Sequence, residues 1–560
     1  MQAASALASQ RRSIDPTTLA VLKGRLEEIA AEMDATLVRS AFNPIIAEAH
    51  DCAHGLYDAE TGETLVQGKN GLPVFVGTMA FATKAVIERA KRDGDLGPGD
   101  VYVMNDPYDG GTHINDVKLL QPLFRDGQVF CWLASVGHWL DMGGNVAGNY
   151  NPRAVELAQE GFWLPVVKLA HRGVLRQDII DIMLANTRLP QMAFGDLQAQ
   201  LNALRVGQAR MTELLDQTGD ETVATVFAEL KERASRMMRH HFAALPDGTY
   251  SADDYLDNDG SSDEPIRIAL DLTIRGEEVT LDFSRSSPEC AGPLNTARST
   301  SIASCYVAIK HLFPDVIANS GVLEPITFVM PEGSIVNVRA PRPTGGYTET
   351  NLRIVDVVFQ AFAQATPERA SACAYGTISA LALAGRRPNG ARWVMFSFHG
   401  GGHGAHPAGD GLNHGNAPLS MATMPPLEIT EANYPVMYRQ WALRPDSGGP
   451  GQHRGGLGAI YEIEVLDGPV DLTLFCDRGK YPPPGVVGGG PAARGRYTYV
   501  KDGVTHQLPL TTKVVGVSLN RGDRVRLESP GGGGYGPPER RDAARVERDR
   551  RDGYVMEAGR

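Results

Sequence analysis

Apolar residues at helical spacing mark the first part of the chain. Asp15 and Pro16 offer an N-cap followed by proline at the first helical position. The apolar positions that follow recur every three or four residues: Leu19, Leu22, Leu26, Ile29, Met33 and Leu37. Similar patterns predict helices over residues 79–92, 178–184, 197–215 and 221–244. Pro246-Asp247-Gly248 ends this helical region and is a candidate domain boundary.

The pattern then changes to the alternation of apolar and polar residues that is typical of strands. Residues 266–284 predict a hairpin around Arg275-Gly276, and helical periodicity returns over 295–312 and 351–365. From about Trp393 onwards, short strand-like runs are separated by glycine-rich loops. The sequence therefore predicts a mixed α+β fold, with helices, antiparallel sheets and a β-rich C-terminal part.

The length of 560 residues exceeds what one hydrophobic core usually supports, so several domains are expected. We predict an N-terminal mixed α/β region that carries the candidate site, a central mixed domain, a β-rich domain and a charged C-terminal tail. Their bounds are 1–247, 248–390, 391–536 and 537–560. In the tail, Arg alternates with Asp and Glu, which is typical of a solvated or partner-facing helix.

Charge and cysteine content limit which partners and which cellular compartment are expected. A net charge of -12 argues against a nucleic acid, because phosphate contacts require a basic face. The six cysteines form no CxxC pair, which favours free thiols in a reducing compartment. No run reaches the roughly 18 apolar residues of a membrane span. We therefore expect a cytoplasmic protein without a membrane or nucleic-acid partner.

The candidate chemistry lies at the ends of one predicted hairpin. Apolar runs over 117–124 and 129–136 flank the turn Arg125-Asp126-Gly127-Gln128. Antiparallel pairing about this turn brings opposed residues to within roughly 5 Å of each other. The entrance of the first strand, with His113 and Asp116, then meets the exit of the second, with His138 and Asp141.

Two imidazoles and one carboxylate leave positions open on a divalent metal, as a catalytic site requires. His113, Asp116 and His138 fit that pattern, although each histidine taken alone would be read as a core residue. The same ligand types suit oxygen-activating iron, but the spacing HxxD departs from the HxD of many such sites. The preceding loop, with Asn105, Asp106, Tyr108 and Asp109, either supports the ligands or is an Asx-type turn.

Three other polar clusters have weaker signals. Glu48, His50, Asp51 and His54 form either a second arm of the site or a solvated, capping segment. The histidines between His399 and His414 are flanked by glycines, which favours a loop over a ligand set. Arg444 and Arg454 could hold an anion or form a salt-bridged turn. The sequence contains no GxxxxGK[ST] motif, so a nucleotide would have to be bound by another chain.

Long motifs over almost the whole chain resemble the hydantoinase B / 5-oxoprolinase group, which includes caprolactamase-type and ketone carboxylase subunits. They are NDPYDGGTHINDV with GHWLDMGG, GPLNTARST, ANSGVLEPI with MPEGSIVN, LEITEANYPVMYRQWALRPDSGGPGQHRGGLG, and GDRVRLESPGGGGYGPPERR. The resemblance implies that His113, Asp116 and His138 hold the metal and that Asp51, in AHDCA, is a further ligand. Two positions depart from the family pattern: Phe75 replaces a histidine and Glu324 an arginine. Both departures bear on substrate specificity.

The resemblance also implies a function. It suggests the catalytic subunit of an ATP-dependent cyclic amide hydrolase that opens hydantoin, 5-oxoproline or lactam rings. ATP with magnesium is then held by an A-type ATPase partner in a hetero-oligomer, and the chain itself holds a divalent metal: zinc, manganese or iron. Their positions near the candidate metal ligands suggest Glu48, Asp106 or Asp141 as the proton acceptor. Two alternatives stay open: a subunit of an ATP-dependent ketone carboxylase, and a scaffold for the ATPase.

Overall fold

The computed structural model describes residues 14–556. The first part contains an antiparallel sheet of seven strands in the order β2-β1-β5-β4-β3-β6-β7. The strands are β1 (Cys52–Asp58), β2 (Thr64–Gln67), β3 (Val101–Met104), β4 (Asp116–Arg125), β5 (Gln128–His138), β6 (Val167–His171) and β7 (Val174–Leu175). Because β4 and β5 lie at its centre, the predicted hairpin is flanked by further strands along both edges.

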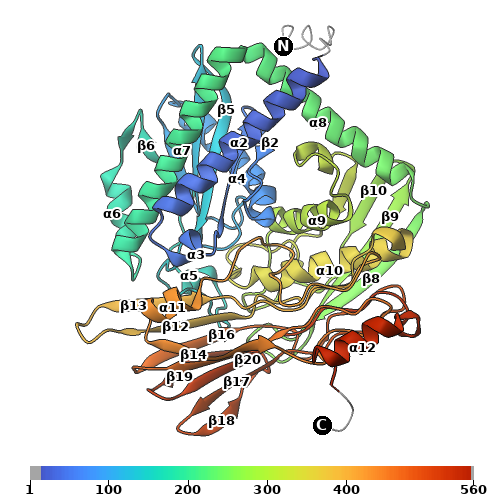
Figure 1. The fold of residues 1–560 in the computed structure, drawn as a ribbon. Helices are drawn as coiled ribbons and strands as arrows, with labels where there is room; N and C mark the ends of the chain where they lie inside the picture. Colours follow the sequence, from blue (N-terminus) through green and yellow to red (C-terminus); the bar gives the residue numbers. More distant parts are fainter. Residues whose placement is uncertain (1–13, 557–560) are drawn as a thin grey trace.

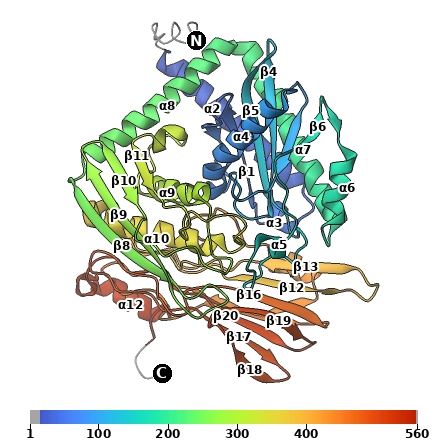
Figure 2. The same cartoon turned by 180° about the vertical axis from the view of Figure 1, so that it is seen from behind.

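Helices cover the two faces of this sheet. On one face lie α2 (Pro16–Ser40) and α7 (Pro190–Thr218), and on the other lies α4 (Pro73–Asp93) (Figures 1 and 2). Successive residues of β5 point to opposite faces of the sheet: Leu133 packs on the α2 side and Trp132 on the α4 side. Asp15 caps α2, since its carboxylate accepts from the Thr17 backbone N–H at 2.9 Å. The short helices α3 (Pro44–Ala47), α5 (Leu157–Glu160) and α6 (Gln177–Ala185) lie in the connections.

The long helix α8 (Asp220–Ala243) leads into the central part (Figure 1). Its four-stranded sheet has the order β11-β10-β9-β8, in which only β10 and β11 run parallel. The strands are β8 (Gly248–Leu256), β9 (Ile266–Arg275), β10 (Glu278–Asp282) and β11 (Ile326–Val329). Helices α9 (Arg298–Leu312) and α10 (Tyr347–Ala365) share one hydrophobic cluster with this sheet and with α4. The short 3₁₀ segments are η1 (Ser320–Leu323) and η2 (Pro367–Arg369).

Two antiparallel sheets enclose the core of the C-terminal part, at the bottom of Figure 1. One has the order β13-β12-β16-β19 and the other β14-β15-β20-β17-β18. Their bounds are β12 (Ala380–Arg386), β13 (Arg392–Ser397), β14 (Val436–Leu443), β15 (Ala459–Val465), β16 (Val470–Phe475), β17 (Arg496–Lys501), β18 (Val504–Gln507), β19 (Lys513–Leu519) and β20 (Arg524–Glu528). Helices α11 (Leu427–Asn433) and α12 (Ala543–Arg551) and the 3₁₀ turn η3 (Pro538–Arg540) complete it.

The mixed α+β prediction is confirmed, as are the antiparallel sheets and the β-rich C-terminal part. β12 precedes residue 391 yet pairs with β13 and β16. The division at 247, 390 and 536 stays a prediction. Between residues 14 and 556, no helix is long and apolar enough to cross a bilayer.

Candidate metal centre

The hairpin of β4 and β5 sets the geometry of the site. Its register places Asp116 directly opposite His138. The turn contains Asp126 with a φ of 47° and Gly127 with a φ of 78°, the left-handed conformations that a tight hairpin requires. His113 lies three residues before the first strand position, where its backbone carbonyl accepts from the Asp116 N–H at 3.1 Å. This local turn folds the His113 ring back onto the end of the strand.

Three donor atoms converge at this point. Asp116 Oδ1 lies 2.9 Å from His113 Nε2 and 3.1 Å from His138 Nδ1, and the two ring nitrogens are 3.2 Å apart. Donor atoms about 2.1 Å from one ion stand about 3.0 Å apart at right angles and about 3.4 Å apart at tetrahedral angles. All three residues are buried. The set therefore fits a single metal ion.

Asp51 brings a second carboxylate to the cavity beside these residues. It directly precedes β1, which pairs with β5, and its backbone carbonyl accepts from the His138 N–H at 3.1 Å. Its side chain lines the same small cavity as His113 and His138, and its Oδ1 is buried without a hydrogen-bond partner among the described residues. Burial raises the pKa of this carboxyl to about 7. An unpartnered buried carboxylate oxygen is costly, and a bound cation would satisfy it.

Neighbouring side chains fix Asp116. Its Oδ2 accepts from the hydroxyl of Thr112 and, at 3.4 Å, from that of Tyr347. Burial alone would raise the pKa of Asp116, but the two imidazoles hold it well below its usual value. The carboxylate is therefore ionised, as a metal ligand must be. Tyr347 begins α10, more than 200 residues away in sequence, so local patterns gave no signal for it.

Aromatic rings enclose the site. The His138 ring stacks on Phe396 with centroids 5.6 Å apart, and Phe396 stacks on Tyr150 at 4.6 Å. The cavity between these rings holds about 50 Å³ and is also lined by Phe75 and Phe398. Its remaining polar groups include Thr348, whose Oγ1 is buried without a partner among residues 14–556. Among the described residues that line this cavity there is no lysine or arginine.

The three predicted proton acceptors have different surroundings. Asp141 Oδ2 pairs with Arg188 at 3.0 Å, and its Oδ1 accepts from the Gly143 N–H, so this carboxylate organises the chain after β5. Asp106 accepts from the Tyr108 N–H at 2.9 Å, which is the Asx-type turn considered above. Glu48 is half-buried three residues before Asp51. None of the three lines the small cavity, and their role stays a prediction.

The other histidines lie outside the small cavity. His54 lies on the α2 side of β1, between Asp34 at 2.7 Å and Ser135 at 2.9 Å, and it forms a second buried metal-compatible group with Asp34 and Cys52. His399 Nδ1 donates to the Ser379 carbonyl at 3.0 Å, and burial lowers its pKa to about 4. The metal-compatible groups found between residues 14 and 556 do not include the histidines from His399 to His414. Arg444 and Arg454 both donate to backbone carbonyls, which supports the structural reading of their loop.

Lys118 is a buried residue that the sequence did not single out. It lies on β4 two residues after Asp116, and its Nζ donates to the Gly110 carbonyl at 3.0 Å. Burial lowers the pKa of this ammonium group to about 8. A lysine in the middle of an apolar strand is the available signal, because a buried charge needs a partner. Lys118 thus fastens the loop that leads to His113.

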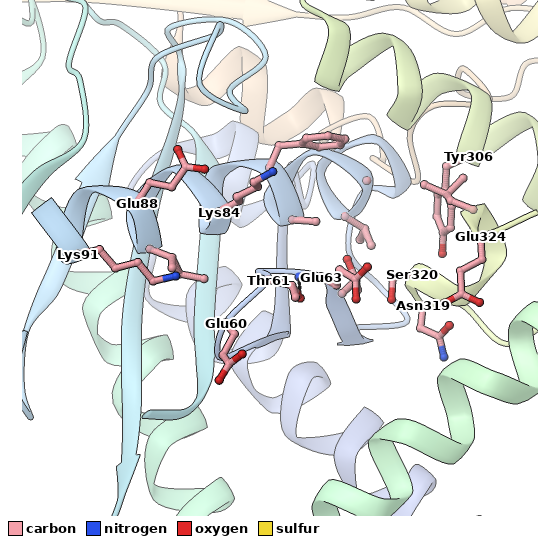
Figure 3. A pocket seen from close by; sticks show the side chains of 17 residues that line it. Glu60, Thr61, Glu63, Lys84, Glu88, Lys91, Tyr306, Asn319, Ser320 and Glu324 are labelled. Carbon is pink, nitrogen blue, oxygen red and sulfur yellow. Dashed lines mark hydrogen bonds between the residues drawn. The ribbon is translucent and has the colours of Figure 1, made fainter. Parts of the chain in front are cut away.

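A larger cavity of about 610 Å³ lies on the other side of α4 (Figure 3). Its walls come from the β1–β2 turn, α4, α9 and η1, and they include Glu63 and Glu324. Both carboxylates pair with Lys231, at 2.7 and 3.2 Å. The sequence departure at Glu324 therefore lies in this outer cavity, whereas the departure at Phe75 lies at the metal centre. We assign the chemistry to the smaller cavity, because His113, Asp116 and His138 converge beside it with the unpartnered oxygen of Asp51.

Asp196 gives the site a pH-dependent support. Its Oδ1 accepts from the backbone of Phe42 and Asn43, and the Asn43 amide donates to the His138 carbonyl. Burial raises the pKa of Asp196 to about 7, so the folded chain retains a proton that the unfolded chain releases near pH 3.8. The contribution of Asp196 to the free energy of unfolding is therefore fully present at low pH. It decreases by at most about 1.4 kcal/mol per pH unit as the pH rises to 7.

Asp196→Asn removes this titration and keeps the accepting oxygen. Relative to the variant, we expect the free energy of unfolding of the wild type to decrease from pH 5 to pH 7. Urea unfolding at pH 5, 6 and 7 measures the difference. A constant difference between the two proteins over this range would contradict the assignment.

Comparisons with known proteins identify the family of this chain. The family model "Hydantoinase B/oxoprolinase" matches residues 15–538. The chain is 33% identical to caprolactamase subunit beta of Pseudomonas jessenii, covering 97% of this chain and 94% of the relative. It is 29% identical to 5-oxoprolinase 1 of Arabidopsis thaliana, covering 93% of this chain and 42% of the relative.

Two solved structures share the fold. The crystal structure of ATP-dependent caprolactamase from Pseudomonas jessenii superposes with a TM-score of 0.87 at 32% identity, covering 97% of this chain and 95% of that one. Nucleotide-free acetone carboxylase gives 0.90 at 21% identity, covering 97% and 78%, which shows a likeness of fold. Given the family match over residues 15–538 and these relatives, the chain is a member of the hydantoinase B/oxoprolinase family.

Proposed function

We propose that this chain is the metal-binding catalytic subunit of an ATP-dependent cyclic amide hydrolase. The observation that carries the proposal is the convergence of His113, Asp116 and His138 beside the unpartnered oxygen of Asp51. These four residues would hold one divalent ion. Two imidazoles with carboxylates suit zinc, manganese or iron.

A divalent ion at this position supplies a Lewis acid and lowers the pKa of a bound water. The chain's own residues prepare the surroundings. Thr112 and Tyr347 hold Asp116 through its second oxygen. Phe75, Phe396 and Phe398 line the cavity and exclude bulk water, which strengthens polar interactions inside it. Glu48 is half-buried and lies three residues before Asp51, which lines the cavity. It is our choice of proton acceptor.

We propose that a separate A-type subunit binds ATP with magnesium. The related caprolactamase chain is named a beta subunit, and the solved caprolactamase is named ATP-dependent. The present sequence has no P-loop motif. A partner that activates the ring carbonyl with ATP would then hand the substrate to this cavity. The assembly is a cytoplasmic hetero-oligomer in this proposal.

The cavity lining favours a neutral ring. Phe75 departs from the histidine of the family pattern, and none of the described lining residues is a lysine or arginine that could pair with a substrate carboxylate. Burying an unpaired carboxylate costs several kcal/mol. We therefore expect an unsubstituted lactam to be hydrolysed with a kcat/KM about a hundredfold above that of 5-oxoproline.

Co-expression with the A-type subunit tests this function. ATP-dependent turnover is measured on lactams, hydantoins, 5-oxoproline, and ketones with bicarbonate. Ring opening of a cyclic amide that requires both ATP and the partner supports the proposal. ATP turnover only with a ketone and bicarbonate would replace it with carboxylation. If the purified complex contains no metal and His113→Ala leaves its ATPase activity unchanged, the chain is a scaffold for the ATPase subunit.

A further inference from the structure

A cavity of the C-terminal part lies on the five-stranded sheet. It holds about 540 Å³, and its walls come from β17, β18, β20 and the loop over residues 479–495. These strands lie at the bottom of Figure 1. The volume is within the range of small-molecule pockets, which hold roughly 300–1,000 Å³. This cavity shares no lining residue with the metal cavity, so it is a separate place on the chain.

The charged residues of this cavity are mostly arginines. Its described lining contains Arg444, Arg494, Arg496 and Arg526, and Glu528 is the one carboxylate in it. Four positive charges and one negative charge give the cavity a formal charge of +3, in a chain whose net charge is -12. Such a cavity attracts anions locally, although the net charge of the protein repels them.

The strand register gathers part of this charge on one face of the sheet. Arg496 of β17 lies directly opposite Glu528 of β20, and Thr498 lies opposite Arg526. Opposed residues on antiparallel strands point to the same face of a sheet. Arg526 is neutralised there, because it pairs with Glu528 and with Glu462 of β15, both at 3.1 Å. The one carboxylate of the cavity is therefore already engaged by an arginine.

The guanidinium of Arg444 is buried and fixed at the wall of the cavity. Arg444 is 8% exposed, and its Nη1 donates to the carbonyls of Arg494 at 2.7 Å and Ser529 at 3.1 Å. Its Nε and Nη2 form no hydrogen bond with the described residues, and Nε lies 3.6 Å from Oε2 of Glu528. Neither nitrogen belongs to the fully buried donors that lack a partner, so both keep a surface open to the cavity.

Two exposed arginines add further unsatisfied donors. Arg494 and Arg496 are exposed, and neither side chain has an ion-pair partner among residues 14–556. Burial lowers the pKa of Arg444, and the positive charge of Arg496 lowers it further, against the opposite effect of Glu528. The guanidinium groups of Arg444 and Arg496 therefore repel each other, and an anion bound between them would remove that cost.

We propose that Arg444, Arg494 and Arg496 form a binding site for a phosphate group. Guanidinium groups donate pairs of hydrogen bonds to phosphate oxygens. A phosphate group carries a charge of about −1.5 to −2 at pH 7, which suits a site with three arginines and a carboxylate that is already paired. Its tetrahedral oxygens accept from several directions at once, whereas a planar carboxylate is satisfied by a single guanidinium.

Isothermal titration calorimetry of the full chain tests the site by binding alone, so its outcome is independent of the proposed hydrolase activity. Titrations with inorganic phosphate and with methyl phosphate distinguish a free ion from the phosphate group of a larger molecule. We expect saturable binding that Arg496→Gln weakens about tenfold or more, because charge-assisted hydrogen bonds are lost. Arg494→Gln should weaken it as well. Both side chains are exposed, so the variants should unfold in urea like the wild type.

Controls separate this site from general charge effects and from the metal. Arg521 is an exposed arginine in the turn before β20, outside the cavity, and Arg521→Gln should leave binding unchanged. Phosphate also binds metal ions, so His113→Ala should retain the binding if the arginines hold the anion. Absence of binding at about 10 mM phosphate, on the order of ten times a millimolar dissociation constant, would overturn the proposal. Binding that Arg496→Gln preserves, or acetate binding as tight as that of methyl phosphate, would overturn it equally.

Discussion

His113→Ala is expected to lower the metal content of the purified chain to a small fraction of one ion and to reduce activity at least about a hundredfold. Loss of a residue that only supports a metal ligand costs about 10–100-fold in affinity or activity, so loss of a ligand should cost at least as much. The His113 ring supplies one of three donor atoms that lie within 3.2 Å of each other. Its removal leaves Asp116 and His138 as an incomplete set.

Metal analysis by mass spectrometry and turnover of the co-expressed complex are the two measurements. His506→Ala is the matched control, because that ring stacks on Tyr499 at 4.8 Å in the C-terminal sheet, outside the metal cavity. Asp51→Asn extends the test, since it keeps the shape and removes the charge of the unpartnered carboxylate. A stoichiometric metal in the His113→Ala protein would show that the ion is held elsewhere.

The hairpin was predictable because its signals are local. A glycine-containing turn between two apolar runs fixes the register, and that register places Asp116 opposite His138. Asp141 lies only three residues further, but the chain leaves the strand after His138 and the carboxylate meets Arg188. Local patterns therefore placed Asp116 opposite His138 and did not determine the direction of the Asp141 side chain.

Long-range contacts supplied what local patterns lacked. Asp51 came from the family resemblance, because the pairing of β1 with β5 leaves no periodic signal in either segment. Tyr347 and Phe396 reach the site from α10 and β13, through packing of elements far apart in sequence.

The start of α4 shows the same limit. The prediction began at residue 79, whereas the helix begins at Pro73. Val74, Phe75 and Val76 are all buried between the sheet and α9, so this run lacks an amphipathic pattern. Gly77 permits the close approach, since a Cβ there would lie 2.6 Å from Ala303 Cβ.

Arg478→Met is expected to lower the free energy of unfolding by about 3–5 kcal/mol, the largest effect we expect on stability. Arg478 follows β16 and is completely buried. Its guanidinium bonds Asp254 of β8 at 2.6 and 3.0 Å and Asp356 of α10. It therefore ties the C-terminal sheets to the central part of the chain. Without it, the two buried carboxylates keep only the more distant guanidinium of Arg353, at 4.0 Å from Asp254 and 3.7 Å from Asp356. One of them must then take up a proton or draw in water.

Urea unfolding near neutral pH measures the effect, and an exposed pair provides the comparison. Arg285 bonds Asp271 at 2.6 and 2.7 Å on the surface of the central sheet, and Arg285→Met should cost no more than about 1 kcal/mol. Adding Asp254→Leu and Asp356→Leu to Arg478→Met should recover part of the lost stability, because no carboxylate is then left beside the missing guanidinium and Arg353 keeps Asp477 at 2.7 Å. If the Arg478→Met loss matched that of Arg285→Met, the buried cluster would contribute no more than a surface pair. The difference between the two arginines therefore measures the cost of leaving charge unpaired where water is excluded.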